Sequence, residues 1–233
     1  MKQFAALASL LVIFACSKEQ PEGNVHISGV VNGLKQGTLI IRNDENTQTI
    51  DSIVIKGDSN FESHFTLESP QLLHIYLNRG VTTSIDNSLD VFVEPGDLRI
   101  ETTLDRFYAD AKITGSKGHE LLQEYKKGNQ RYTDQQLELM EKRLTAFKNK
   151  TAFDEVSAVE EANKIEARRY LHAINFAVNH KDNHIAPFIG LSVRDANLKL
   201  LDTLMGSLTP DVAEGKYGKM LKDLIEQRRK AGQ

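Results

Sequence analysis

The spacing of apolar residues changes at Gly115 and Ser116, and this change constrains the fold more than any other feature of the chain. Before it, apolar and polar residues alternate in short runs, which is typical of half-buried strands. After it, apolar residues recur at intervals of three and four, which is typical of amphipathic helices. We therefore predict an α+β protein, with an antiparallel β-sandwich-like domain at residues 25–115 and a helical region at residues 116–233.

The first half contains seven short apolar runs that we expect to form strands. They are spaced about every 8 to 12 residues with turn residues between them, which favours an antiparallel sandwich or barrel over a parallel sheet. The turn residues at 57–60 predict a hairpin between the third and fourth runs, and residues 94–97 supply another tight turn. The runs lie near residues 25–31, 38–41, 49–55, 61–67, 72–77, 90–93 and 98–102.

Capping signals divide the second half into helices. Ser116 is expected to be the N-cap of the first helix. The Thr-Asp-Gln-Gln sequence at residues 133–136 fits a capping box and predicts that a second helix begins there. Thr209 followed by Pro210 predicts an N-cap with proline at the first helical position. The second helix has an apolar stripe of Leu137, Met140, Leu144 and Phe147, and further stripes lie near residues 170–178, 198–205 and 217–225.

Cys16 is the only cysteine, and it follows twelve predominantly apolar residues at positions 4–15. With Lys2 before this run and a small residue just before the cysteine, the segment resembles a bacterial lipoprotein signal with its lipobox. A membrane-spanning helix needs about 20 apolar residues to cross about 30 Å of hydrocarbon, so the run is too short to span. We expect removal of residues 1–15, lipidation of Cys16 and a flexible tether over residues 16–24.

The charge is distributed unevenly between the two halves. Residues 17–115 contain 8 Lys or Arg against 15 Asp or Glu, a net charge of −7. Residues 116–233 contain 20 against 17, a net charge of +3. Because the basic residues of the second half are interleaved with acids, they predict a solvated helical surface and no nucleic-acid partner.

Four segments resemble a known family in their order and spacing. They carry turn residues between apolar positions and lie at residues 26–34, 54–65, 91–100 and 114–116. In these segments the chain resembles domain of unknown function 4369, the N-terminal domain of Bacteroidetes envelope lipoproteins. In that family the domain usually precedes a thioredoxin-like domain of the AhpC/TSA type. Residues 116–233 are similar to the helical linker between the two domains.

The resemblance implies a lipoprotein of the cell envelope, and the absence of Asp after Cys16 leads us to expect outer-membrane delivery. The chain ends at Gln233 without the Cys-x-x-Cys of the thioredoxin-like domain. An acylated Cys16 would leave the mature protein without a thiol, whereas dithiol redox catalysis needs two. The family's catalytic residues therefore have no counterpart here. A stand-alone module and the truncated front half of an oxidoreductase both remain open.

Two patterns resemble metal sites but lack an essential member. His180 and His184 have the spacing of helical ligands, yet the Glu of a His-Glu-x-x-His site is absent between them. Asp86, Ser88 and Asp90 copy the odd-number spacing of a calcium loop, but the sixth position is valine where glycine is needed. We interpret both segments as turns and predict neither a metal nor a cofactor.

Catalytic patterns are also incomplete. The segment around Ser116 lacks the first glycine of Gly-x-Ser-x-Gly, and no glycine-rich phosphate loop occurs. Asp51, Glu94 and Asp97 would serve a glycosidase only if two of them faced each other at a fixed separation. We predict no catalytic residue. An envelope hydrolase is an alternative that depends on two acidic groups or a Ser-His pair converging in a cleft.

Aromatic residues near the strands suggest a binding function. Most aromatics should pack in the core, but exposed ones would form a face for a sugar, a peptide or another envelope protein. The candidates are Tyr76, Phe92, Phe107 and Tyr108. We therefore predict a non-catalytic, lipid-anchored binding module of the cell envelope. The alternative is an accessory protein that docks on a separate thioredoxin-like protein.

Overall fold

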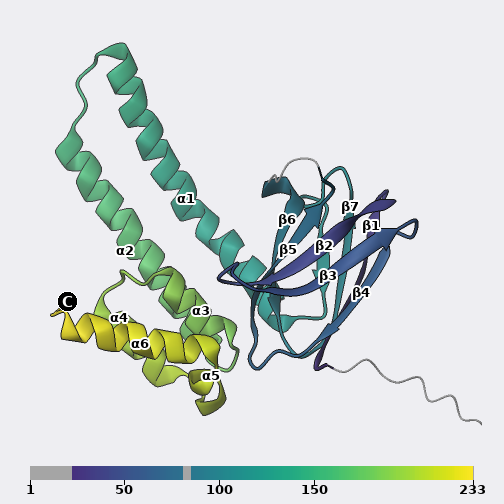
Figure 1. Cartoon of the computed structure of the whole chain (residues 1–233). Coiled ribbons are helices and arrows are strands. Elements are labelled where there is room, and N and C mark those ends of the chain that lie inside the picture. The colour runs from purple at the N-terminus through teal and green to yellow at the C-terminus, as the bar shows by residue number, and fades with distance from the viewer. Residues whose placement is uncertain (1–22, 81–84, 233) are drawn as a thin grey trace, which may run out of the picture.

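A computed structural model describes residues 23–80 and 85–232 of the chain (Figure 1). The predicted signal peptide and Cys16 lie outside the described residues. Strands occupy the described chain up to Thr114, and α-helices run from Lys117 to Lys230. The predicted α+β class is therefore confirmed, with a β-sandwich and a group of helices beside one end of it.

Within the described residues, eight strands form two four-stranded sheets. The first sheet has the order β4-β1-β7-β8 and the second has the order β3-β2-β5-β6. All pairings are antiparallel except that of β1 with β7, which is parallel. The strands are β1 (Val25–Asn32), β2 (Gln36–Asn43), β3 (Thr49–Lys56), β4 (Asn60–Phe65), β5 (Gln71–Asn78), β6 (Ser88–Val93), β7 (Gly96–Thr103) and β8 (Lys112–Thr114), and a short 3-10 helix, η1 (Ile85–Asn87), precedes β6.

The predicted hairpin at residues 57–60 is wrong, because β3 and β4 belong to different sheets. Ile55 on β3 and Phe61 on β4 are both buried in the sandwich core, so this turn carries the chain from one sheet across to the other. The turn after β6 does the same. Turn residues specify a reversal of direction, but the choice between pairing within one sheet and crossing the core depends on the other strands.

The alternation of apolar residues produces the sandwich core. Inward-facing positions of both sheets are buried, whereas their neighbours in sequence face outward. Complete burial of each such side chain stabilises the fold by about 1.5 to 3 kcal/mol. The largest fully buried side chains here include Ile27, Leu39, Ile41, Leu73, Ile75 and Ile100.

Six helices follow the sandwich, and the first is longer than the sequence predicts. The helices are α1 (Lys117–Asn149), α2 (Glu155–Asn179), α3 (Ile185–Ser192), α4 (Leu198–Ser207), α5 (Pro210–Glu214) and α6 (Lys216–Lys230). The predicted break at residues 133–136 is wrong, because α1 continues through it. There the Asp134 carboxylate accepts a hydrogen bond from Gln130, four residues earlier, at 2.8 Å, so the residue supports the helix from within.

The predicted helix start at Ser116 is confirmed. The Ser116 hydroxyl oxygen accepts a hydrogen bond from the backbone N–H of His119 at 3.0 Å, as an N-cap should. Thr209 is the residue before α5, which has Pro210 in its first turn as predicted. Among the described helices, none combines the length and the apolar composition that crossing a membrane requires.

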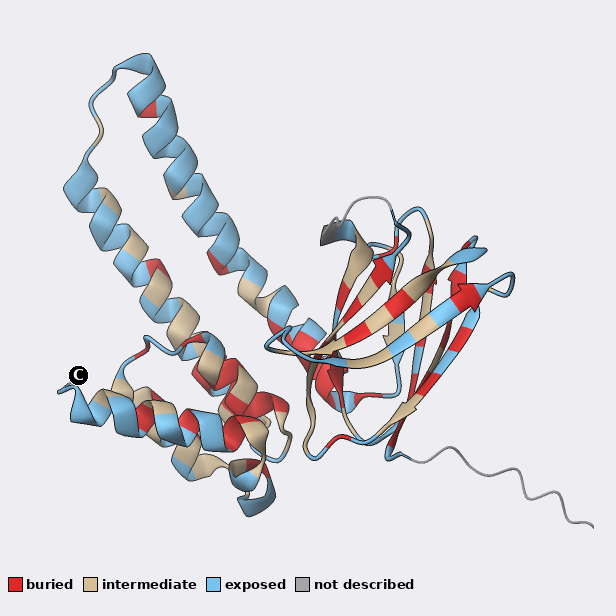
Figure 2. Cartoon of the chain, viewed as in Figure 1, coloured by how far each residue is buried: buried red, intermediate tan, exposed pale blue. Residues whose placement is uncertain are grey.

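A second core joins the helices to the sandwich. Its members come from α1, α2, α3, α4 and α6, together with Phe92 from β6. Gly118 allows the close approach of α1, since a Cβ atom there would lie 2.5 Å from Cδ1 of Phe92. Burial is concentrated where α1 and α2 meet the other elements, and their far ends are mostly exposed (Figure 2).

Candidate functional site

The junction between the sandwich and the helices contains a half-buried polar cluster around Glu94. This residue follows β6, and its carboxylate accepts a hydrogen bond from the Gly118 N–H at 2.8 Å and lies 3.1 Å from the Ser116 hydroxyl oxygen. It also accepts a hydrogen bond from the Asn183 side chain, between α2 and α3, at 3.0 Å. The negative charge lies beside the N-terminus of α1, where the helix dipole favours it. Glu94 therefore fixes two parts of the helical region to the sheet.

A second cluster connects α6 to the turn after β2. The Tyr217 hydroxyl donates to Asp44 at 2.7 Å and accepts from the backbone N–H of Leu72 at 2.9 Å, while Lys216 pairs with Asp44. Burial alone would raise the pKa of Asp44, but hydrogen bonds from neighbours including Lys216 and Tyr217 outweigh it, so this pKa is lowered. Burial, followed by the hydrogen bond to Asp44, raises the pKa of Tyr217. These groups hold the two halves together.

A cleft of about 1280 Å³ lies next to these clusters. It is lined by the ends of β3 and β4, the segment before β5, and the start of α6, and its lining mixes apolar and charged side chains. Ile50, Phe65 and Pro95 provide apolar surface, whereas His184, Glu214 and Lys219 provide polar groups. Ser69 and Asp211 also line the cleft, and Nε2 of His184 lies 3.2 Å from Oδ2 of Asp211.

The three acidic residues considered for hydrolysis have separate partners. Asp51 on β3 accepts a hydrogen bond from the Ser63 hydroxyl. Glu94 belongs to the junction, and Asp97 on β7 pairs with His26 at 2.9 Å. The described structure therefore does not bring these carboxylates together as a hydrolytic pair.

The four candidate aromatics do not form one face. Phe92 and Phe107 are buried, the first in the helical core and the second in the sandwich core, so neither offers an exposed surface. Tyr76 on β5 is half-buried, with the Arg42 guanidinium 5.7 Å from its ring centre. Tyr108 is 60% exposed. The predicted aromatic binding face is therefore not assembled, because two of its members provide core packing.

The histidine pattern lies between α2 and α3, as its interpretation as a turn predicts, but the pattern of Asp86, Ser88 and Asp90 extends into a strand. His180 follows the last residue of α2, and His184 precedes α3 with its Nε2 atom 3.2 Å from Asp211. Asp86 lies in η1, and Ser88 and Asp90 lie on β6. None of these five residues belongs to a group of potential metal ligands among the described residues.

An exposed apolar surface covers the far end of the α1–α2 hairpin. We call it the hairpin surface. Its side chains are between 57% and 85% exposed, although large apolar residues usually lie inside. It includes the stripe predicted for the second helix and two exposed valines near the start of α2. The members are Leu137, Met140, Leu144 and Phe147 of α1 and Val156 and Val159 of α2.

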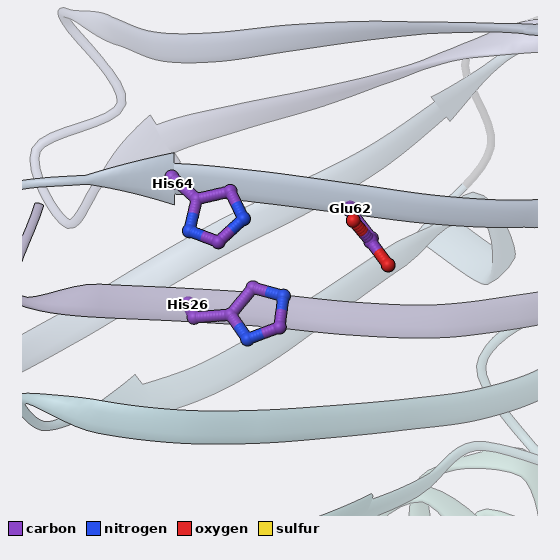
Figure 3. A group of neighbouring side chains, drawn as sticks. All are labelled: His26, Glu62 and His64. Atoms are coloured by element: carbon purple, nitrogen blue, oxygen red, sulfur yellow. The ribbon is translucent and has the colours of Figure 1, made fainter. Parts of the chain in front are cut away.

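A group of potential metal ligands lies on the outer face of the first sheet (Figure 3). His26 on β1 is directly opposite His64 on β4, and Glu62 is two residues before His64 on the same face. One ligand atom from each residue lies within 4.8 Å of the others. The two imidazole rings are stacked, with their centres 4.2 Å apart and an angle of 3° between their planes.

Sequence reasoning missed both of these surfaces. The spacing of Glu62 and His64 places them on one face of a strand, and this signal was available. His26 joins them only because β1 pairs with β4, and no local pattern shows this pairing. The exposure of the hairpin surface depends on how far the other helices reach along α1 and α2, which is a property of the tertiary structure.

The protein belongs to a structural class in which a β-sandwich carries a helical region. Two half-buried polar clusters and a shared apolar core hold the two parts together. Residues 25–122 match the family model for a domain of unknown function, DUF4369. This part of the chain is therefore similar to that domain, as the sequence motifs predict. The match includes the sandwich and the first turns of α1, where Leu121 and Leu122 join the core around Phe92. No curated protein and no solved structure matches the chain.

Proposed function

We propose that this protein is a non-catalytic, lipid-anchored interaction module of the cell envelope. The observation that carries this proposal is the hairpin surface, which exposes six large apolar side chains at the end of a projecting helical hairpin. Soluble proteins rarely expose a contiguous apolar surface unless another molecule covers it. The sandwich and the helical core support the hairpin, and the hairpin binds the partner.

The spacing and charge of the hairpin favour a second copy of this chain as the partner. Leu137, Met140, Leu144 and Phe147 follow the three-four spacing of a coiled-coil seam. Residues 142–150 carry four basic side chains and no acid, while residues 154–161 carry four acids and no base. Within one chain Arg143 already pairs with Glu155 at 3.0 Å. A two-fold axis would place the remaining basic side chains of one α1 beside the remaining acids of the other α2, so the same surface serves both copies.

The anchoring part of the proposal rests on the lipobox-like segment that ends at Cys16. Acyl chains on this residue would attach the protein to a membrane, with residues 16–24 as the tether. Radiolabelled palmitate supplied to a bacterial host should label the chain and leave a Cys16→Ser variant unlabelled. Equal labelling of both proteins, or of neither, would overturn the lipid anchor and leave the hairpin proposal unaffected.

Sedimentation equilibrium tests the hairpin proposal. The protein is the chain from residue 16 with Cys16→Ser, which contains all described residues and avoids lipidation. We expect a dimer, and Leu144→Glu should weaken it by about 30-fold or more, the factor that corresponds to a hot-spot loss of about 2 kcal/mol. The charged side chain would have to lose its water in the apolar seam.

The matched control is Leu171→Glu, which changes the same residue type on α2. Leu171 is 48% exposed, against 61% for Leu144, and it lies outside the hairpin surface. The control variant should dimerise like the parent protein. A parent protein that remains monomeric at high concentration would overturn the second copy as partner, as would equal weakening by both substitutions.

A further inference from the structure

We infer that His26, Glu62 and His64 form a binding site for a divalent transition-metal cation, with zinc as the best match. The three residues lie on the outer face of the first sheet, away from the hairpin surface, so this inference is independent of the proposed function. Two imidazole nitrogens and one carboxylate oxygen are a ligand set that zinc accepts. The two strands that provide them are directly hydrogen-bonded to each other.

The hydrogen bonding of His26 favours a role as a metal ligand. Its Nδ1 atom lies 2.9 Å from Oδ1 of Asp97 on β7, and a carboxylate only accepts hydrogen bonds, so Nδ1 carries the hydrogen. In the neutral ring, Nε2 then carries a lone pair. This Nε2 atom is buried and has no hydrogen-bond partner among the described residues. A carboxylate behind a histidine that presents its other nitrogen is the usual support of a metal ligand.

A second histidine provides an internal comparison. His74 on β5 lies on the outer face of the second sheet, and its Nδ1 atom is 2.8 Å from Oδ1 of Asp90. Its Nε2 atom, however, is 3.1 Å from the backbone oxygen of Asp44. The same histidine–aspartate pair therefore occurs on both sheets, but only on the first is the second nitrogen left without a partner. His26 has the arrangement of a ligand, and His74 has the arrangement of a satisfied structural residue.

The three potential ligands lie close enough together to form a metal site after side-chain rotation. Each imidazole ring has a nitrogen on the side of Glu62 (Figure 3). Zinc lies about 2.0 to 2.1 Å from nitrogen ligands, which places two such nitrogens about 3.3 Å apart in a tetrahedral site. The three ligand atoms already lie within 4.8 Å of one another. Because the two rings are parallel, their nitrogen lone pairs do not converge in this arrangement, and metal binding requires His64 to rotate while His26 keeps its Asp97 partner.

Zinc in this position would connect the edge strand β4 to its neighbour β1. Three protein ligands leave a fourth position for water or for a ligand atom from another molecule. Because the metal binds only the folded arrangement of the two strands, it should raise the melting temperature, and the rise should continue with the logarithm of the zinc concentration above saturation.

Isothermal titration with zinc chloride tests the inference. The protein is the untagged chain from residue 16 with Cys16→Ser, because a free thiol would also bind zinc. We expect saturable binding of one equivalent. His26→Gln and His64→Gln should each weaken binding by at least about tenfold, and Asp97→Asn should weaken it by about tenfold through the orientation of His26.

The control variant is His74→Gln, which removes a histidine of the same kind from the other sheet. It should bind zinc like the parent protein and show the same zinc-dependent rise in melting temperature. NMR signals of the His26 and His64 rings should shift with one equivalent of zinc, and those of His74 should not. His64→Gln decides the matter even if His26→Gln folds poorly, because the His26–Asp97 pair remains intact.

Two results would overturn the inference. The first is the absence of saturable binding in the parent protein. The second is a loss of affinity in His74→Gln as large as that in His64→Gln, since this would show that zinc binds surface histidines without selection. Neither result affects the hairpin surface, whose test uses no metal.

Discussion

The two ends of α1 have opposite surroundings. At the start, Leu121 and Leu122 are 3% exposed and pack in the core around Phe92. At the far end, Leu144 and Phe147 are 61% and 85% exposed. One continuous helix therefore serves as structural support at one end and as a presented surface at the other. Stability and binding should respond to substitutions at different ends of the same element.

The largest effect on stability should come from Phe92, the sandwich residue in the helical core. Its ring lies 5.9 Å from that of Phe188 and 6.1 Å from that of Tyr217. Phe92→Ala would leave a cavity between the two halves, and we expect the free energy of unfolding to fall by about 3 to 5 kcal/mol. Urea denaturation measures this change. A loss below about 1 kcal/mol would mean that the junction does not depend on this residue.

Acidification should lower the stability of the protein through His119, near the start of α1. Burial, together with the charge of Lys126, lowers the pKa of His119 from 6.5 to about 4. Between these two pH values the unfolded chain binds a proton that the folded chain does not, so stability falls as the pH falls. Between pH 7 and pH 5 we expect a loss of about 2 kcal/mol from this residue.

Urea denaturation at both pH values tests this prediction, with His119→Gln as the control. The variant should lose less stability on acidification than the parent protein, because it has no group that titrates at this position. Asp44 does not interfere, since its pKa is lowered and it titrates only in stronger acid. An identical acid loss in both proteins would contradict the assignment to His119.

Ser116 should have a smaller effect on the junction. Its hydroxyl group caps α1 and donates to the backbone oxygen of Phe92 at 2.7 Å. Ser116→Ala removes the cap, and we expect the free energy of unfolding to fall by about 1 kcal/mol. Ser116→Asp is the informative companion, because it keeps a capping oxygen but places a second charge beside Glu94. An alanine variant as stable as the parent would show that water replaces the cap.

The smallest effect on stability should come from Phe147, at the far end of α1. Phe147→Ala removes a large side chain that is almost fully exposed in one copy, so we expect the stability of the monomer to change by less than about 0.5 kcal/mol. Thermal denaturation at low protein concentration checks this value. A loss comparable to that of Phe92→Ala would erase the difference between the two ends.

Residue spacing predicted most of the fold and little of the sites. The period-two pattern located all seven predicted strands, because burial on one face of a sheet fixes this pattern. The turn at residues 57–60 was misread as a hairpin, and the polar segment at residues 133–136 was misread as a helix start. In both places a local signal is compatible with two structures, and contacts distant in sequence decide between them.

The sites depend still more on distant contacts. Glu62 and His64 share a face that their spacing reveals, but His26 is 36 residues earlier than Glu62 in the chain. Tyr217 reaches Asp44 across 173 residues. For Cys16 the opposite holds, because its predicted lipidation rests entirely on local sequence. The residue itself lies outside the described structure.

The continuity of α1 through the end of the family match at residue 122 has a geometric consequence. An α-helix advances by about 1.5 Å and turns by about 100° with each residue. One residue inserted between Gly128 and Thr133 would rotate the apolar stripe at the far end of α1 by about 100° relative to the sandwich, and the sandwich itself would not change. Seven residues, close to two full turns, would nearly restore its direction. The length of this segment therefore sets the direction in which the apolar stripe of α1 faces relative to the sandwich.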